Sequence, residues 1–210
     1  MPTVAGANSS PTLLVVGDSL SAGYGLDLDE GWVDLLATRL EDTGYEYRIV
    51  NASISGDTTS GGLARLGLAL KKHAPRIVVI ELGGNDGLRG IPLKTIRQNF
   101  EQMIALCRET NAQVVLLGIR IPENYGRRYT EQFHKLYAEI ATEYELPWIE
   151  FFMDGVALDT GLMQRDGIHP NAAGQPRLLD NAWPAISVAL KTVDAAAGHS
   201  AAGPTGASLE

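Results

Sequence analysis

Val15-Val16-Gly17-Asp18-Ser19-Leu20-Ser21 lies near the start of the chain, and the fold can be worked outward from it. The run Leu13–Val16 is apolar and β-branched, which is typical of a buried strand. The segment after Gly17 is rich in serine and glycine, so the strand ends abruptly in a polar turn. In α/β folds such a junction presents a side chain at the carboxyl edge of a parallel sheet. Here that side chain is Ser19, whose hydroxyl is a poor nucleophile without a base, an orienting acid and an oxyanion hole.

Strand and helix patterns alternate along the rest of the chain. Apolar runs predict strands over Thr12–Gly17, Arg48–Asn51, Arg76–Leu82, Gln113–Ile119 and Pro147–Phe152. Apolar residues at helical spacing predict helices over Trp32–Leu40, Leu63–Leu70, Thr95–Glu109, Tyr129–Tyr144 and from Asn171 onward. Pro176 and Pro184 are expected to divide the last helix into two pieces. The alternation predicts an α/β fold, a three-layer α/β/α sandwich around a five-stranded parallel sheet in flavodoxin-like strand order.

Composition limits the classes of partner. The chain has 210 residues, which suits one domain, and a net charge of −8, which argues against nucleic acid and anionic membranes as partners. Cys107 is the only cysteine, so no internal disulfide can form. No apolar run approaches the roughly 20 residues of a membrane span. We expect a monomer with no cofactor, and no metal, because no Cys/His cluster supports a metal site.

Both ends of the chain differ in composition from the middle. Residues 1–10 are small and polar, and Ala5-Gly6-Ala7 resembles the cleavage site of a secretory signal. A trimmed signal and a floppy N-terminus are both consistent with this segment. Residues 194–210 are almost entirely Ala, Gly, Ser, Pro and Thr, which predicts a disordered tail, and Leu209-Glu210 is typical of residues appended in cloning. A single domain is therefore expected over residues 11–193.

Polar segments follow the predicted strands and supply the partners that Ser19 needs. The chain has four histidines: His73, His134, His169 and His199. His73 lies at the end of a predicted helix, where a solvated role is expected; His134 lies within a predicted helix and is interpreted as a surface residue; His199 lies in the tail. His169 alone lies in a loop, three residues after Asp166. Asp166 can accept the Nδ1 proton of His169, which leaves Nε2 to take the proton of Ser19.

Oxyanion donors can come from two other strand ends. Gly56 allows close approach of the backbone to a substrate and offers its N–H, and Asn85 can offer its side-chain amide. The N–H of Ser19 is a natural third donor. Each residue alone would be interpreted as a turn glycine or a helix cap, so their combination carries the interpretation.

Four segments together resemble the motif blocks of the GDSL, or SGNH, hydrolase family. They are Gly17-Asp18-Ser19-Leu20, Ser55-Gly56-Asp57, Gly83-Gly84-Asn85-Asp86 and Asp166-Gly167-Ile168-His169. Asn51–Thr58, Glu81–Gly90 and Asn124–Tyr129 are similar to the bacterial multifunctional acyl-CoA thioesterase, arylesterase and lysophospholipase subgroup. The resemblance implies a triad of Ser19, Asp166 and His169, and oxyanion donors from Ser19, Gly56 and Asn85. It also implies a periplasmic or secreted enzyme that acts on acyl esters and thioesters.

The segment Ile119–Arg128 is expected to form a loop at the same edge as Ser19. Ile121 and Pro122 are predicted to contact an acyl chain in a groove. Arg127 and Arg128 are interpreted as solvated surface residues in preference to contacts for an anionic head group.

Two other functions stay open at this point. One is a carbohydrate O-acetyl esterase on the same scaffold, which the low aromatic content of 7% weakens. The other is a non-enzymic, flavodoxin-like binding module, which the absence of GxGxxG and P-loop patterns weakens.

Overall fold

A five-stranded parallel sheet organises the described part of the computed structural model, which comprises residues 10–196 and 198. Its strands are β1 (Thr12–Gly17), β2 (Arg48–Asn51), β3 (Ile77–Glu81), β4 (Gln113–Leu117) and β5 (Trp148–Ile149). They lie in the order β2-β1-β3-β4-β5, and every pairing is parallel. The predicted flavodoxin-like strand order is therefore confirmed.

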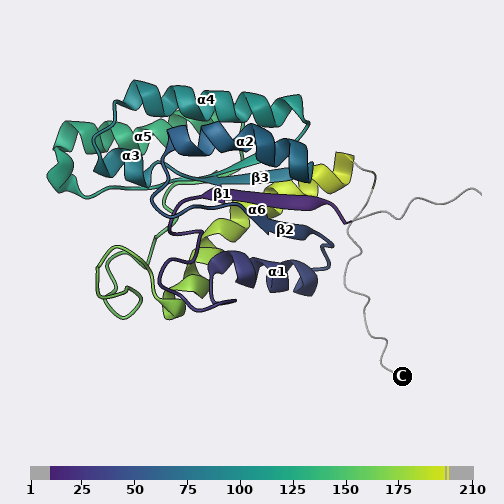
Figure 1. Cartoon of the computed structure of the whole chain (residues 1–210), viewed down its shortest axis with the longest axis horizontal. Helices are drawn as coiled ribbons and strands as arrows, with labels where there is room; N and C mark the ends of the chain where they lie inside the picture. Colours follow the sequence, from purple (N-terminus) through teal and green to yellow (C-terminus); the bar gives the residue numbers. More distant parts are fainter. Residues whose placement is uncertain (1–9, 197, 199–210) are drawn as a thin grey trace, which may run out of the picture.

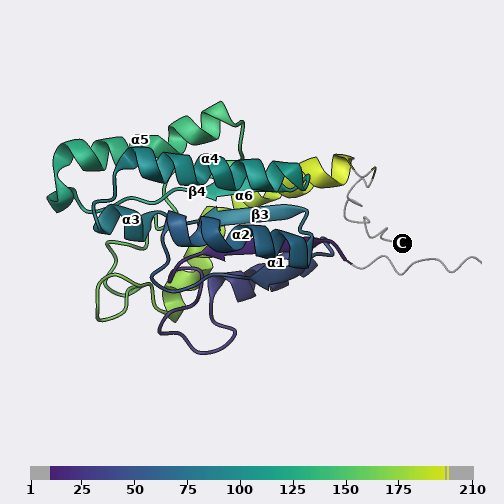
Figure 2. The ribbon, with the colours of Figure 1, turned by 45° about the horizontal axis from the view of Figure 1, so that its top comes forward.

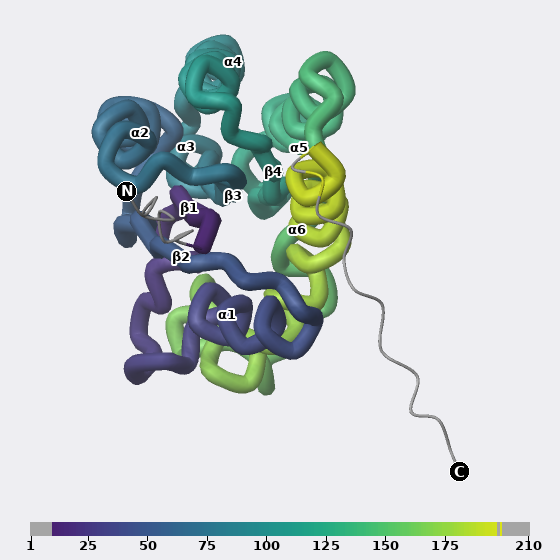
Figure 3. Tube along the Cα trace, turned by 90° about the vertical axis from the view of Figure 1, so that its right-hand side faces the viewer, coloured from purple at the N-terminus to yellow at the C-terminus, as the bar shows by residue number. Residues whose placement is uncertain are grey.

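Helices cover both faces of the sheet (Figure 3). One face carries α1 (Trp32–Asp42) and α6 (Gln175–Ala196), which pack against each other. The other carries α2 (Thr59–His73), α4 (Leu93–Glu109) and α5 (Arg127–Glu143). Because both faces of the central strands are covered, all residues of β1 and β3 are buried. The three-layer sandwich is confirmed.

The carboxyl ends of the strands lie at the left of Figure 1. Three short elements gather around this edge: α3 (Gly84–Leu88) and the 3₁₀ turns η1 (Glu123–Tyr125) and η2 (Ala172–Gly174). The sequence patterns did not predict them, since elements of three to five residues carry no measurable periodicity. Figure 2 shows, at the same edge, the loop before α6 beside the segment that follows β1. Segments far apart in the sequence therefore meet where the sheet ends.

The C-terminal helix differs from its prediction. α6 runs unbroken through both prolines, so the expected division into two pieces is wrong. Pro176 lies in the first turn, where a backbone N–H has no intrahelical partner to lose. Pro184 lies inside the helix, and buried residues on both sides of it, such as Ala182 and Ile186, hold the helix on the core. The helix also extends to Ala196, beyond residue 193, where the disordered tail was expected to begin. The expected signal remnant and the rest of the expected tail fall almost entirely on residues that lie outside the described part of the chain.

Candidate active site

The turn after β1 places Ser19 at the carboxyl edge of the sheet. β1 ends at Gly17, and one helical turn follows, in which the N–H of Ala22 donates to the carbonyl of Asp18 over 2.9 Å. A side chain at Gly17 would meet Ser21 at 2.7 Å and Glu81 at 2.8 Å, so no larger residue fits at the strand end. Ser19 itself is half-buried, with its hydroxyl directed toward the loop before α6. The predicted strand-to-turn junction is thus present.

Ser19, His169 and Asp166 form a continuous hydrogen-bonded chain. The Oγ of Ser19 lies 3.0 Å from Nε2 of His169, and Nδ1 of His169 lies 2.7 Å from Oδ2 of Asp166. The other carboxylate oxygen of Asp166 accepts the N–H groups of Ile168 and His169. These contacts, the His169 side chain first, lower the pKa of Asp166 to about 2. An ionised Asp166 only accepts hydrogen bonds, so Nδ1 must donate, and Nε2 is left to accept the Ser19 proton.

A second set of contacts ties the histidine loop to the serine loop. The amide of Gln164 donates to the carbonyls of Tyr24 over 2.7 Å and Pro170 over 3.0 Å. The N–H of Gln164 donates to the carbonyl of His169 over 2.8 Å. The ring of Tyr24 packs on the imidazole of His169, with centroids 4.5 Å apart. Gln164 therefore fixes the loop that carries His169, and Tyr24, from the loop after β1, packs against the imidazole.

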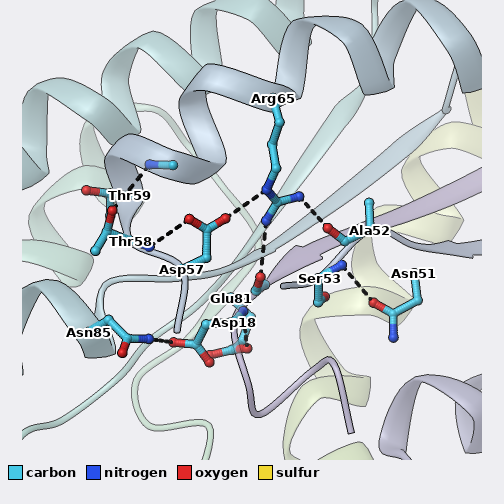
Figure 4. Close-up of polar contacts among 12 residues, drawn as sticks. Asp18, Asn51, Ala52, Ser53, Asp57, Thr58, Thr59, Arg65, Glu81 and Asn85 are labelled. Atoms are coloured by element: carbon cyan, nitrogen blue, oxygen red, sulfur yellow. Dashed lines mark hydrogen bonds and ion pairs between the residues drawn. The ribbon is translucent and has the colours of Figure 1, made fainter. Parts of the chain in front are cut away.

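Three N–H groups near Ser19 each have a hydrogen that is not hydrogen-bonded to any of the described residues. Within the described residues, the backbone N–H groups of Ser19 and Gly56 donate no hydrogen bond. Gly56 has a φ of 79°, a left-handed conformation that favours glycine. The side-chain amide of Asn85 donates one hydrogen to Asp18 Oδ2 over 3.0 Å, which leaves its second hydrogen without an acceptor (Figure 4). Such unsatisfied donors are what a developing oxyanion requires.

Asp18 and Glu81 form a buried carboxyl pair behind the serine turn. Glu81 is fully buried, and its Oε2 accepts the hydroxyl of Ser21 over 2.7 Å and the N–H of Asp18 over 3.4 Å. Its Oε1 has no hydrogen-bond partner in the described structure. Burial raises the pKa of Asp18 to about 6, and burial together with the nearby Asp18 raises the pKa of Glu81 well above its ordinary value. Burial therefore disfavours the charged form of Glu81, and Asp18 is the carboxyl that accepts a hydrogen bond from Asn85.

Glu81→Gln is expected to flatten the pH dependence of stability. Glu81 has a higher pKa in the folded than in the unfolded chain, so its contribution is fully present below the unfolded value near 4.5 and is lost as pH rises toward the folded value. The free energy of unfolding of the wild type should fall relative to Glu81→Gln by up to about 1 kcal/mol per pH unit above pH 5. Urea titrations between pH 5 and 8 measure the difference. The exposed Glu46→Gln serves as control, and parallel pH curves for wild type and Glu81→Gln would contradict the raised pKa of Glu81.

Of the two apolar residues expected to line an acyl groove, only one has an exposed side chain. Pro122 is exposed, whereas Ile121 is 5% exposed and packs into the core beside Phe133 and Gly87. Their contact with an acyl chain stays a prediction. The N–H of Ile121 donates to Nε2 of His134 over 3.3 Å, and His134 is half-buried on α5.

The two arginines of this loop lie on the surface. Arg127 and Arg128 are both exposed, and Arg127 pairs with Glu131 one helical turn away, at 3.0 Å. Both placements agree with the solvated interpretation.

Several side chains around the site carry no recognisable sequence signal. Gln164 binds the backbone carbonyl of Tyr24 in another loop, the ring of Tyr24 packs on His169, and Arg65 on helix α2 binds the backbone carbonyl of Gly17. Asp18 and Asp57 belong to the motif blocks, but their partners lie far away in the sequence or on a helix. Only a three-dimensional arrangement reveals these contacts.

Comparison with known proteins gives concordant matches. Residues 15–177 match the model of the GDSL-like lipase/acylhydrolase family. The chain is 53% identical to the "Esterase TesA" of Pseudomonas aeruginosa over 87% of this chain and 90% of that protein. It is 47% identical to the "Thioesterase 1/protease 1/lysophospholipase L1" of Escherichia coli K12, over 83% and 82%. The structure of the psychrotrophic esterase EstA from Pseudoalteromonas sp., inhibited by monoethylphosphonate, superposes with a TM-score of 0.82 at 40% identity, over 87% of this chain and 100% of that one.

Proposed function

The chain belongs to the GDSL-like lipase/acylhydrolase family, and on that premise we propose that it hydrolyses carboxylic esters and thioesters through an acyl-enzyme on Ser19. The chain is a serine hydrolase of the esterase type. The observation that carries the residue assignment is the hydrogen-bonded chain from Ser19 Oγ to His169 at 3.0 Å and from His169 to Asp166 at 2.7 Å. A nucleophile, a base and an orienting acid in this arrangement suit acyl transfer.

The first half of the reaction acylates Ser19. Its Oγ attacks the carbonyl carbon of the substrate while Nε2 of His169 takes the hydroxyl proton. The carbonyl oxygen becomes an oxyanion, which the N–H groups of Ser19 and Gly56 and the amide of Asn85 stabilise. His169 then returns the proton to the leaving alcohol or thiol, and the acyl-enzyme remains. Asp166 stays ionised throughout and stabilises the imidazolium.

The second half of the reaction repeats these steps with water as the nucleophile. His169 takes a proton from water, which attacks the acyl carbon, and the same three donors stabilise the second oxyanion. Collapse of that intermediate returns the proton to Ser19 Oγ and releases the carboxylic acid. No proton or electron has to come from any other group.

We propose a broad substrate range that comprises aryl esters, acyl-CoA thioesters and lysophospholipids. The printed name of the E. coli relative joins thioesterase and lysophospholipase activities in one protein. Exposed residues such as Tyr24 and Pro122 leave the edge around Ser19 open. Each methylene of an acyl chain contributes only about 1–3 kcal/mol to discrimination in an apolar site, so an open edge distinguishes acyl donors weakly.

We also propose that the enzyme acts in the periplasm or outside the cell. The small-residue segment Ala5-Gly6-Ala7 supports export, although it lies outside the described residues. Among the described residues, none of the helices combines the length and the apolar character needed to cross a membrane.

A substrate panel tests the proposed function. Purified protein is assayed with p-nitrophenyl esters of increasing chain length, palmitoyl-CoA, a lysophosphatidylcholine and acetylated xylan. Turnover of the first three classes with weaker turnover of acetylated xylan is the expected result. Turnover confined to the acetylated polysaccharide would contradict the proposal and support an O-acetyl esterase.

A further inference from the structure

Arg65 makes three hydrogen bonds, one to the end of β1 and two to the loop between β2 and α2. Its Nε donates to Asp57 Oδ2 over 2.7 Å, its Nη1 donates to the carbonyl of Ala52, and its Nη2 donates to the carbonyl of Gly17 over 3.2 Å. Figure 4 shows the guanidinium of Arg65 extending from α2 to Asp57 on one side and to Ala52 on the other. The side chain of Arg65 is 21% exposed and that of Asp57 is 13% exposed, so the ion pair is largely shielded from water. None of the reaction steps above uses Arg65.

The three acceptors flank the proposed oxyanion donors in the sequence. The carbonyl of Gly17 lies at the end of β1, two residues before Ser19, whose N–H is one donor. Ala52 and Asp57 are at the two ends of the loop that carries Gly56, whose N–H is a second donor. The carbonyl of Gly17 also accepts the N–H of Ile54 over 3.1 Å, from the same loop. Arg65 therefore joins the serine turn and the Gly56 loop through a single rigid group.

The chemistry of this position needs a guanidinium. Its N–H groups lie in one plane at fixed angles, so one side chain can satisfy three acceptors that face different directions. The ammonium of a lysine is a single point charge and cannot span all three. Asp57 is itself fixed, because its Oδ1 accepts the N–H of Thr58 over 2.9 Å. Arg65 and its three acceptors, which we call the clamp, are therefore fixed at the Asp57 carboxylate as well as at the guanidinium.

We propose that Arg65 is a positioning residue that sets the separation between the Ser19 and Gly56 donors of the oxyanion hole. The inference rests on the proposed function, because it needs these donors to face a tetrahedral intermediate. Oxyanion donors act when they are fixed about 2.7–3.1 Å from the position that the oxyanion will occupy. A loosened clamp weakens binding of the transition state and leaves binding of the ground-state substrate unchanged, so it lowers kcat and not KM.

Arg65→Lys tests the clamp with its charge retained. The variant is expected to lower kcat for p-nitrophenyl butyrate by roughly 10- to 100-fold, the range of losing part of an oxyanion hole, with KM changed by less than about 2-fold. Affinity for an aryl boronic acid, which forms a tetrahedral adduct on the serine, should fall by the same factor as kcat/KM. In Arg65→Ala, guanidinium at concentrations too low to denature the protein is expected to restore part of kcat.

Arg97→Lys is the matched control. Arg97 also joins two elements by multiple contacts, since it binds Glu101 on its own helix α4 and Glu139 and Glu143 on α5. Its partners lie outside the proposed active site, so kcat and boronic acid affinity should change by less than about 2-fold, as for most surface substitutions. The comparison separates a loss of catalytic geometry from the general loss of an arginine network.

The outcomes separate the inference from the proposed function. Wild-type kcat in Arg65→Lys, or a lower kcat with unchanged boronic acid affinity, would overturn the role of Arg65. If Arg65→Lys fails to fold, Asp57→Asn is used in its place. Asparagine keeps the oxygen that accepts the Thr58 N–H and removes the charge that pairs with Arg65. A lower kcat at constant KM is expected for Asp57→Asn, and a wild-type kcat would overturn the inference. An active Ser19→Ala would instead refute the proposed function. An inactive Ser19→Ala beside a fully active Arg65→Lys would refute the inference alone.

Discussion

Ser19→Ala is expected to lower kcat/KM for p-nitrophenyl esters by on the order of 10⁴-fold or more, the size of effect seen when a triad nucleophile is removed. The substitution deletes the atom that lies 3.0 Å from His169 Nε2 and leaves no other hydroxyl in its place. The remaining donors of the oxyanion hole can still polarise a bound carbonyl, so a residual rate of about 10³-fold or more over the uncatalysed reaction should persist. Steady-state kinetics with p-nitrophenyl butyrate, together with the thermal unfolding midpoint, measure the effect and the integrity of the fold.

Ser187→Ala is the control for this substitution. Its hydroxyl lies on the surface of α6, where it donates to the carbonyl of Pro184 over 2.9 Å. Its kcat/KM should equal that of the wild type. Full activity in Ser19→Ala would refute the residue assignment, whatever the stability of the variant.

Asp166→Asn is expected to lower kcat/KM by on the order of 10³- to 10⁴-fold. The carboxylate accepts Nδ1–H of His169 at 2.7 Å and thereby selects the tautomer whose Nε2 can take a proton. An amide can present its NH₂ to Nδ1 instead, and the imidazole then carries its proton on Nε2 and cannot act as a base. KM should change little, because Asp166 does not contact the substrate in the proposed mechanism.

The low pKa of Asp166 fixes the pH range over which its carboxylate can orient His169. Hydrogen bonds from His169 and the backbone hold its pKa near 2, below the ordinary value of 3.8. A depressed pKa stabilises the loop above the ordinary value, and that contribution is lost only as pH falls toward 2. Asp166 is therefore ionised from pH 6 to pH 9, and its own titration adds no pH dependence to the defect of Asp166→Asn in this range. Asp159→Asn, in the same connection before α6, replaces a turn-forming aspartate that accepts the N–H of Gly161, and it should retain activity. A comparable loss in Asp159→Asn would attribute the effect to loop distortion and contradict the role of Asp166.

Much of the fold follows from pattern because the central strands are buried on both faces. An apolar run such as Ile77–Ile80 has no alternative to a covered strand, and the parallel order follows from helical crossovers of one hand. The continuous α6 does not follow from pattern. Pro184 carries the local signal of a helix break, and burial of Ala182 and Ile186 outweighs that signal in the folded chain.

The residues at the centre of the site can also be predicted from the sequence pattern. Ser19, Gly56, Asn85 and His169 follow strand ends or a loop, and a parallel sheet brings its strand ends to one edge. The side chains that fix them are not predictable in this way. Arg65 reaches the carbonyls of Gly17 and Ala52, and a backbone carbonyl acceptor leaves no trace in the identity of its residue. A loop sequence also does not reveal that the side chain of Ile121 turns into the core, and its contact with an acyl chain stays a prediction.

Covalent labelling tests the central claim, the nucleophilic role of Ser19, most directly. The protein is treated with a p-nitrophenyl alkylphosphonate, which forms a stable tetrahedral adduct with an activated serine, and the modified peptide is located by mass spectrometry. We expect a single adduct per chain, on Ser19, with esterase activity lost in proportion to labelling, and no adduct in Ser19→Ala. Inactivation with the adduct on any other residue, or labelling of Ser19 that leaves the activity intact, would contradict the account.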